Sequence, residues 1–215
     1  MLVLVRHGQS EPNARGVLVG RSDPRLTDLG VLQAAAIAEA VSSCGKGSFQ
    51  LFTSPLRRTA DTAAAIAEVS RREGREVVGP EVDERLVELD YGDYDGLSPA
   101  ELPEGTWEAW RKDPRYRPPG GESLSDLAER CSRLWTELGA RAAPGAGDVV
   151  AVTHVSPIKA AVAWALGAGP ELSWRLHLQV ASITRISTGP GSPSLVSFGE
   201  VGHLAGVGTL GGPGP

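Results

Sequence analysis

Cationic and imidazole side chains stand close behind three short apolar runs of this chain. Arg6 and His7 follow "LVLV", and His154 follows "VVAVT". Arg57 and Arg58 come shortly after "LFTS". A guanidinium group offers paired donors to the oxygens of an anion, and an imidazole can act as a nucleophile or a proton carrier. A dianionic phosphoryl group is therefore the ligand that this set of side chains fits best.

A histidine with arginine neighbours has a defined role in phosphoryl chemistry. Nearby positive charge favours the neutral imidazole, which can attack phosphorus and form a phosphohistidine. The oxygen that leaves then needs a proton from a nearby acid. Glu88 in "DERLVELDYGDYDG" is one candidate, and the spacing alone leaves five other carboxyl groups open: Asp83, Glu84, Asp90, Asp93 and Asp95.

The distribution of histidines disfavours a metal centre. The sequence has 4 histidines, without H-x-x-x-H, H-E-x-x-H or an acidic cluster at ligand spacing. We therefore predict no metal and no cofactor. His177 and His203 are interpreted as structural or solvent-exposed residues.

Strand-like and helix-like segments alternate along the chain and would position these side chains. Continuous apolar strands between helices predict an α/β fold, a three-layer α/β/α sandwich with a mostly parallel central sheet. The active site is expected at the carboxyl edge of the strands. The predicted strands cover 2–5, 51–54, 76–79, 148–153, 182–187 and 194–198, and the predicted helices cover about 28–42, 56–72, 124–142, 157–167 and 170–178.

Two Ser-Pro pairs mark predicted helix starts at this edge. Ser54 and Ser156 are the predicted N-caps, with Pro55 and Pro157 at the first helical position. The N–H groups and the dipole of a helix N-terminus favour anions, phosphate above all. Both helices would thus contribute to the same anion site.

The length of the chain suits one domain with a substantial core. We expect this domain to span residues 1–201, and residues 202–215 to be a flexible Gly/Pro-rich tail. Residues 90–121 lack periodicity and are predicted to form an excursion or lid above the sheet. The side chains of this lid that could contact a leaving group are Trp107, Trp110, Arg111, Tyr116 and Arg117.

The composition of the chain indicates which partners and which location in the cell to expect. A formal net charge of -5 disfavours a nucleic-acid partner. The spacing of Cys44 and Cys131 indicates neither a disulfide framework nor a zinc knuckle, which suits a reducing cytoplasm. Lys159 interrupts the apolar stretch "VSPIKAAVAWAL", and no export signal is apparent. We predict a cytoplasmic protein without a membrane partner, and a homodimer is left open.

The motifs, in this order, resemble those of the histidine phosphatase superfamily in its phosphoglycerate-mutase-like branch, over about residues 1–187. The matching segments are "LVRHGQSEPN", "GRSDPRLTDLGVLQA", "TSPLRRTADTA", "RLVELDYGDYDG", "PGGESLSDL" and "VVAVTHVSPIKA". The resemblance implies His7 as the phosphorylated residue and Glu88 as the proton donor. It implies four phosphate ligands: Arg6, Asn13, Arg58 and His154. Three further residues become candidate substrate contacts: Gly20, Arg21 and Val155.

The sequence departs from the family pattern at a few positions. Tyr94, Asp95 and Gly96 stand where Trp-Glu-Gly is usual, and Val155 replaces the glycine often found after the second histidine. Because the catalytic set is intact, these changes affect the shape of the substrate more than the reaction type. The order "DPRLT" leaves the direction of Arg21 and Arg25 open.

The resemblance implies a metal-independent phosphatase acting on a small phosphorylated metabolite. A phosphoglycerate mutase is the second hypothesis. Family mutases usually carry a longer, more basic insertion after the acid, whereas here only residues 89–120 separate Glu88 from Gly121, which favours hydrolysis. A non-catalytic phospholigand-binding protein is the third, and it would need neither a nucleophile nor an aligned acid.

Overall fold

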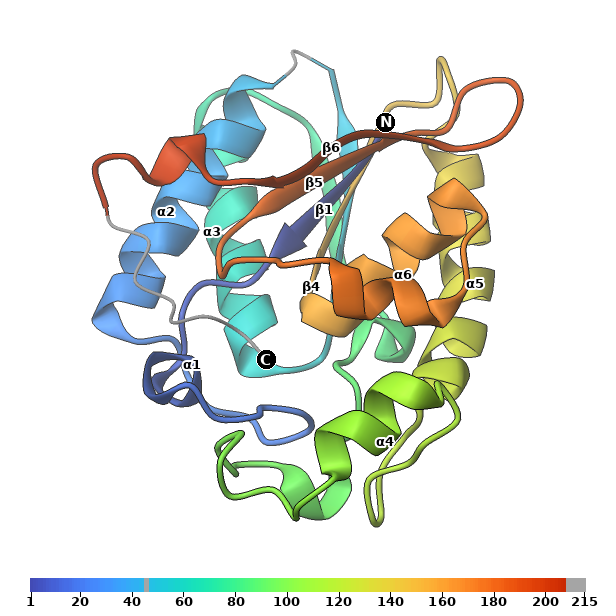
Figure 1. Cartoon of the computed structure of the whole chain (residues 1–215). Coiled ribbons are helices and arrows are strands. Elements are labelled where there is room, and N and C mark those ends of the chain that lie inside the picture. Colours follow the sequence, from blue (N-terminus) through green and yellow to red (C-terminus); the bar gives the residue numbers. More distant parts are fainter. Residues whose placement is uncertain (45–46, 208–215) are drawn as a thin grey trace.

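The computed structural model describes residues 1–44 and 47–207, and a six-stranded sheet forms the centre of this part of the chain. The strands lie in the order β3-β2-β4-β1-β5-β6 (Figure 1). Strands β3, β2, β4 and β1 pair in parallel, and β5 pairs antiparallel with both β1 and β6. The bounds are β1 (Leu2–Arg6), β2 (Phe49–Thr53), β3 (Val77–Val82), β4 (Asp148–Thr153), β5 (Ile183–Ser187) and β6 (Ser194–Glu200). The predicted mostly parallel α/β sheet is confirmed.

Helices cover both faces of the sheet. Those on one face are α2 (Asp28–Ser43) and α3 (Arg57–Arg72), and those on the other are α5 (Leu124–Arg141) and α6 (Val155–Leu166). Shorter elements complete this part of the chain: α1 (Glu11–Arg15), α4 (Thr106–Lys112) and the 3₁₀ helices η1 (Glu84–Leu86), η2 (Gly92–Tyr94), η3 (Pro170–Arg175) and η4 (Gly202–Leu204). The predicted three-layer arrangement is therefore present.

Strand β1 shows how the apolar runs build this core. Leu2 and Leu4 belong to the cluster under α5 and α6, whereas Val3 and Val5 belong to the cluster under α2 and α3. Successive side chains of a strand point to opposite faces, so a continuous apolar run fills two cores at once. The first polar residues after this run then stand at the edge of the sheet.

The structure corrects the predicted helix caps. Helix α3 begins at Arg57, with Leu56 rather than Ser54 at its N-cap, and α6 begins at Val155, with His154 rather than Ser156 at its N-cap. Pro157 consequently lies inside the first turn of α6, and Pro55 precedes α3. Carboxylates from distant segments accept from the first helical N–H groups, so no serine cap is needed.

Two of these carboxylates can be named. Asp23 Oδ1 accepts from the Arg57 N–H at 2.6 Å, and Glu88 accepts from the N–H groups of Val155 and Ser156 at 3.1 Å each. A negative charge at a helix N-terminus is also favoured by the helix dipole. The anion-binding helix ends predicted at this edge are thus occupied partly by the protein's own side chains.

The segment predicted as a helix over 170–178 differs in type and length. It is the 3₁₀ helix η3, which ends at Arg175 because the backbone becomes extended at Leu176 (φ -111°, ψ 123°). This extension carries the chain past the end of β1 and into β5.

The excursion at 90–121 lies beyond the carboxyl edge of the sheet. Figure 1 shows α4, its one α-helix in the described structure, on the side toward which β1 points. Trp110 is 1% exposed, and the Trp107 ring stacks on it with centroids 5.7 Å apart. The excursion is thus a packed aromatic cap over that edge.

The first residues of the predicted tail pack against the domain. Leu204 in η4 is buried and joins the cluster under α2 and α3. Residues 208–215 of that prediction lie outside the described residues. Among the described residues, none of the helices combines the length and the apolar character needed to cross a bilayer.

Candidate active site

Backbone contacts on both sides fix His7 at the end of β1. Its N–H donates to the Thr153 carbonyl of β4 at 3.1 Å, and its own carbonyl accepts from the Ala181 N–H at 2.9 Å. A Cβ on the next residue, Gly8, would lie 2.3 Å from the Gly30 carbonyl oxygen, so only glycine lets the chain pass α2 this closely. His7 is consequently held at the carboxyl edge with 3% of its surface exposed.

The hydrogen bonds of His7 define which ring nitrogen can react. Nδ1 lies 2.7 Å from the Gly8 carbonyl oxygen, which can only accept, so Nδ1 carries the proton and Nε2 carries the lone pair. Burial, followed by the charges of Arg58 and Arg6, lowers the His7 pKa well below its ordinary value. His7 is therefore neutral at physiological pH, with a nucleophilic Nε2.

Arg58 lies directly beside this nitrogen. Its Nε donates to His7 Nε2 at 3.3 Å, and its two terminal nitrogens donate to the carbonyls of Ser22 at 2.7 Å and Gly20 at 2.9 Å. The side chain is fully buried. Arg57, by contrast, is exposed and lies 3.4 Å from Asp23. Of the two arginines in the first turn of α3, Arg58 alone reaches the site.

Asp95 holds the loop that anchors Arg58. Its carboxylate accepts from the Gly20 N–H at 3.1 Å, the Ser22 N–H at 2.9 Å and the Ser22 hydroxyl at 3.0 Å. The Gly20 and Ser22 carbonyls in turn fix the guanidinium of Arg58. Asp95 therefore acts on the site through the position of Arg58.

Replacing Asp95 with alanine is expected to weaken the binding of inorganic phosphate by roughly tenfold. Each lost hydrogen bond is worth about 1 kcal/mol, and only the part of this loss that displaces Arg58 weakens phosphate binding. Isothermal titration calorimetry measures this affinity. Asp93→Ala is the matched control, since Asp93 is exposed on the same loop. Equal phosphate affinity in Asp95→Ala and wild type would show that the loop needs no carboxylate.

His154 is the second imidazole of the cluster. Its ring centroid lies 5.0 Å from that of His7, and its Nε2 is 2.9 Å from the Ser54 hydroxyl. Its Nδ1 is buried and has no hydrogen-bond partner among the described residues. Buried polar atoms are nearly always hydrogen-bonded, so this unpaired nitrogen is unusual, although His154 does not line the cavity. Burial and the charge of Arg58 lower the His154 pKa well below its ordinary value.

These two neutral, buried histidines make stability depend on pH. Below about pH 6.5 the unfolded chain takes up protons that the folded chain cannot, so acid favours unfolding. We expect the free energy of unfolding in phosphate-free buffer to fall by roughly 1.4 kcal/mol per pH unit for each histidine below that pH. Urea titrations of wild type and His154→Asn between about pH 6.5 and 5 measure the slopes. The slope for His154→Asn should be smaller by the contribution of one histidine. Identical slopes for the two proteins would contradict the assignment of His154 as a buried, neutral histidine.

Glu88 is placed by both its side chain and its backbone. One carboxylate oxygen accepts from the Leu89 N–H at 2.7 Å and the Ser156 N–H, and the other accepts from the Val155 N–H. Arg130, paired with Glu122 at 2.7 Å, donates to the Glu88 carbonyl at 3.2 Å. Glu88 is 4% exposed. The carboxylate is thus held rigidly at the N-terminus of α6.

Arg6 approaches from the last residue of β1. One terminal nitrogen donates to the Leu178 carbonyl, and its buried Nε has no hydrogen-bond partner among the described residues. Burial lowers the Arg6 pKa to about 10, so the guanidinium remains charged at neutral pH. Arg6 lines the cavity, so its unpaired Nε can donate to a ligand oxygen there.

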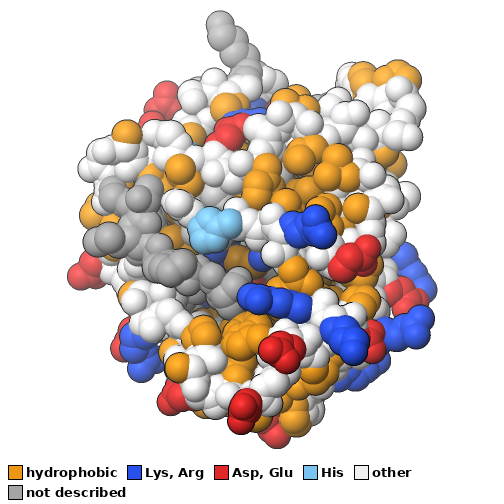
Figure 2. Space-filling view, viewed as in Figure 1, with side chains coloured by type: hydrophobic (Ala, Val, Ile, Leu, Met, Phe, Trp, Pro, Cys, Tyr) orange, Lys and Arg blue, Asp and Glu red, His pale blue; other side chains and the backbone are white. Residues whose placement is uncertain are grey.

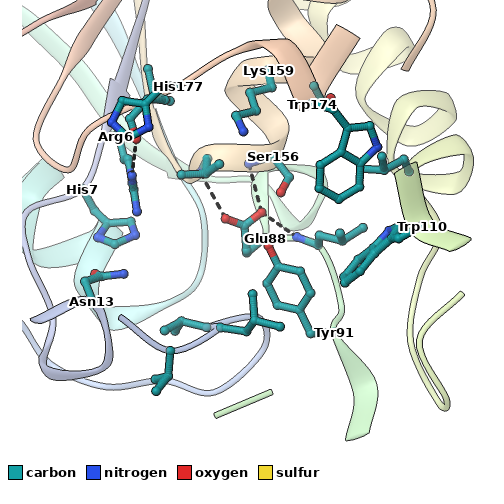
Figure 3. A pocket seen from close by; sticks show the side chains of 18 of the residues that line it. Arg6, His7, Asn13, Glu88, Tyr91, Trp110, Ser156, Lys159, Trp174 and His177 are labelled. Atoms are coloured by element: carbon teal, nitrogen blue, oxygen red, sulfur yellow. Dashed lines mark hydrogen bonds between the residues drawn. The ribbon is translucent and has the colours of Figure 1, made fainter. Parts of the chain in front are cut away.

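A cavity of about 110 Å³ opens between these groups (Figure 3). In Figure 3, His7 and Asn13 lie on one side and Glu88 on the other. Asn13 turns its amide nitrogen toward the cavity, because its amide oxygen accepts from Ser10 at 3.0 Å and 2.7 Å. The predicted site residues that line the cavity are Arg6, His7, Asn13, Glu88 and Val155.

The other predicted residues lie outside the cavity lining. Arg58 and His154 are not part of the cavity lining, and both contact His7. Gly20 uses its backbone for Arg58 and Asp95, and a Cβ on it would lie 2.8 Å from the Leu89 carbonyl. Arg21 is 42% exposed and points to Asp90 at 3.8 Å. The structure therefore places neither Gly20 nor Arg21 on the cavity wall.

Sequence reasoning did not assign several residues that line the cavity: Tyr91, Ser156, Lys159 and Trp174. One signal was available for Lys159, since it is the one charged residue in an otherwise apolar helical stretch. No local pattern distinguished Trp174. Of the lid side chains, Trp107 and Trp110 line the cavity, and Arg111, Tyr116 and Arg117 do not. Within the described residues, His, Cys, Asp and Glu form no group of three that could hold a metal ion.

Comparison with known proteins identifies relatives over nearly the whole chain. The family model described as "Histidine phosphatase superfamily (branch 1)" matches residues 2–201. A glucosyl-3-phosphoglycerate phosphatase of Mycolicibacterium vanbaalenii is 36% identical over 207 residues, which cover 89% of this chain and 88% of that protein. A 2,3-bisphosphoglycerate-dependent phosphoglycerate mutase of Methylorubrum populi is 41% identical over 134 residues, 60% of this chain and 62% of that one.

The solved structures agree with this relationship. A mycobacterial glucosyl-3-phosphoglycerate phosphatase superposes with a TM-score of 0.77 at 32% identity, covering 93% of this chain and 98% of the other. Mycobacterial proteins 38% identical to this chain are longer, and the chain spans 49% of their length.

Proposed function

This chain belongs to the histidine phosphatase superfamily, and we propose that it hydrolyses small phosphomonoesters through a phosphohistidine on His7, with Glu88 as acid and base and without a metal. One observation carries this proposal. The unprotonated Nε2 of His7 stands beside Arg58 and faces a cavity whose other side holds the carboxyl group of Glu88 (Figure 3).

The first half-reaction transfers the phosphoryl group to the enzyme. The lone pair of His7 Nε2 attacks phosphorus, and the bond from phosphorus to the ester oxygen breaks. Protonated Glu88 gives its proton to the departing alkoxide, which leaves as the alcohol. The guanidinium groups of Arg6 and Arg58 stabilise the charge on the remaining phosphoryl oxygens, and Arg58 exchanges its contact with His7 Nε2 for one of these oxygens.

The second half-reaction returns the enzyme to its starting state. A water molecule enters the place of the alcohol, and ionised Glu88 removes its proton as it attacks phosphorus. The bond between phosphorus and Nε2 breaks, and inorganic phosphate leaves. His7 regains its lone pair and Glu88 is again protonated. The hydrogen bond from Nδ1 to Gly8 keeps the ring in one orientation through both steps.

We also infer a class of substrate and a location in the cell. A cavity of this size, capped by Trp107 and Trp110, suits a small phosphorylated metabolite. Figure 2 shows hydrophobic side chains on the surface over η3, α6 and α4, with both basic and acidic side chains among them. We propose residues 1–201 as the catalytic domain, against which η4 packs, with 90–121 as its lid. Both cysteines are free thiols, which supports a cytoplasmic location.

Phosphate release from a panel of phosphomonoesters in EDTA tests this function. We expect turnover above that of His7→Ala for at least some esters. The similarity to a phosphoglycerate mutase makes mutase activity the second candidate. Conversion of 3-phosphoglycerate to 2-phosphoglycerate faster than phosphate release would reverse the order of the two, and tight phosphate binding without either reaction would favour a binding protein.

A further inference from the structure

Lys159 is a cation in the cavity that the phosphoryl chemistry does not use. It lies on α6 and lines the cavity, and Figure 3 shows its ammonium group pointing into this space, between Arg6 and Trp174 in that view. In the described part of the chain it makes no hydrogen bond and no ion pair within 4.0 Å. Its Nζ is not among the buried atoms that lack a partner, so solvent reaches it and it can bind an anionic group that enters the cavity.

Its position on α6 relates Lys159 to the leaving group. The first two residues of α6, Val155 and Ser156, hold the carboxylate of Glu88 with their N–H groups. Lys159 comes four residues after Val155 and three residues after Ser156. It therefore lies on the same face of the helix, one turn farther on. Because Glu88 gives its proton to the departing oxygen, the space beyond Glu88 accommodates the alcohol part of the substrate.

The balance of charge points to the chemistry of that part. Arg6 and Arg58 together match the two charges of a phosphoryl dianion. Glu88 must be protonated, and therefore neutral, when it acts as the acid. One positive charge, that of Lys159, is then unmatched in the complex. A second anion on the alcohol would match it.

We propose that Lys159 binds a second anionic group, a carboxylate or another phosphate, on the leaving-group part of the substrate, so that the preferred substrates are phosphomonoesters of acidic alcohols. This inference rests on the proposed phosphatase function and names its substrate class. The indole of Trp174 forms the adjoining wall, 5.7 Å from the ring of Trp110, and would pack against the carbon skeleton of such an alcohol.

Paired substrates that differ in one group test this directly. 3-Phosphoglycerate and glycerol 1-phosphate share a carbon skeleton, but the first has a carboxylate where the second has a hydroxymethyl group. We expect Lys159→Met to lower kcat/KM for 3-phosphoglycerate by roughly 10- to 100-fold, as for a hydrogen bond to a charged group, and to leave glycerol 1-phosphate within about twofold. Lys159→Arg should retain the preference.

Lys112→Met is the matched control, because Lys112 is exposed at the end of α4. A loss of the same size on both substrates would show that Lys159 binds the phosphoryl group. No loss on either substrate would show that Lys159 binds neither part of the substrate. Either result would overturn this inference and leave the proposed phosphatase function standing. A wild-type protein that hydrolyses no ester, p-nitrophenyl phosphate included, overturns the proposed function as well. Unchanged circular dichroism and melting temperature confirm that Lys159→Met is folded.

The pH dependence gives a second readout. Burial, followed by the charge of Arg6, lowers the Lys159 pKa to about 8, and the opposite charge of Glu88 limits this effect. Since kcat/KM reports the free enzyme, its value for 3-phosphoglycerate should fall as the pH rises through about 8, when Lys159 loses its charge. His177 and Tyr91 line the same cavity. Glycerol 1-phosphate should lack this descending limb, and Lys159→Arg should move it to higher pH; a limb shared by both substrates would contradict the assignment.

Discussion

Replacing His7 with alanine is expected to lower kcat for phosphomonoester hydrolysis by roughly 10⁴-fold or more, the scale seen when a nucleophile is removed. The size follows from the geometry, because the lone pair on Nε2 of His7 faces both the cavity and Arg58. The second imidazole cannot take over the attack, since His154 does not line the cavity. Phosphate release measured at saturating substrate gives the comparison.

A third histidine supplies the control for this variant. His203 Nε2 donates to the Ala181 carbonyl at 2.8 Å, and the residue does not line the cavity. His203→Gln keeps a polar contact there and should retain most of the activity. Residual turnover of His7→Ala above about one hundredth of wild type would remove His7 from the role of nucleophile.

Replacing Glu88 with glutamine is expected to lower kcat by roughly 10²- to 10⁴-fold on alkyl phosphates, the range for a lost general acid and base. Both carboxylate oxygens accept from backbone N–H groups, so the amide of glutamine places one NH₂ group against a donor. The melting temperature should therefore fall as well. Glu84→Gln is the matched control, because Glu84 is exposed in η1 of the same segment.

The leaving group separates the two roles of Glu88. A nitrophenolate departs without a proton, whereas an alkoxide needs one, so the first half-reaction of Glu88→Gln should be far less impaired with p-nitrophenyl phosphate than with an alkyl ester. Single-turnover measurements of alcohol release give this comparison. Equal impairment on both esters would indicate that Glu88 only shapes the site.

The fold, and the meeting of several side chains of the site at one edge of the sheet, could be predicted from the sequence for a local reason. Polar residues such as His7 and His154 directly follow buried parallel strands, and the ends of such strands meet at one edge. The choice of Glu88 and Arg58 among their neighbours came from the family motifs. The structure adds a reason for Arg58, since the neighbouring Arg57 is exposed and paired with Asp23.

The misses share a physical cause, which is that long-range contacts replaced local ones. Ser54 and Ser156 suit N-caps, but Asp23 and Glu88 arrive from other segments and accept from the helix N–H groups. Arg21 matches a motif position, yet its direction depends on where Asp90 lies. Sequence spacing does not specify which segments meet at a cavity.

Lys159 illustrates the opposite case, because a single lysine in an apolar helical stretch was a local sign of a polar site. A lysine inside an apolar amphipathic helix either reaches solvent along its stem or serves a polar site. Only the packing of α6 against the end of β1 shows that Lys159 lies at the site.

Trapping of the phosphoenzyme in Glu88→Gln tests the central claim most directly. With p-nitrophenyl phosphate the variant can still form phosphohistidine, because the leaving group needs no proton, but it lacks the base that activates water. Quenching in alkali and peptide mapping should therefore reveal an acid-labile phosphoryl group on the peptide that contains His7, after a burst of one nitrophenolate per enzyme. Nitrophenolate release without a burst, or a phosphoryl group on any other residue, would contradict the mechanism.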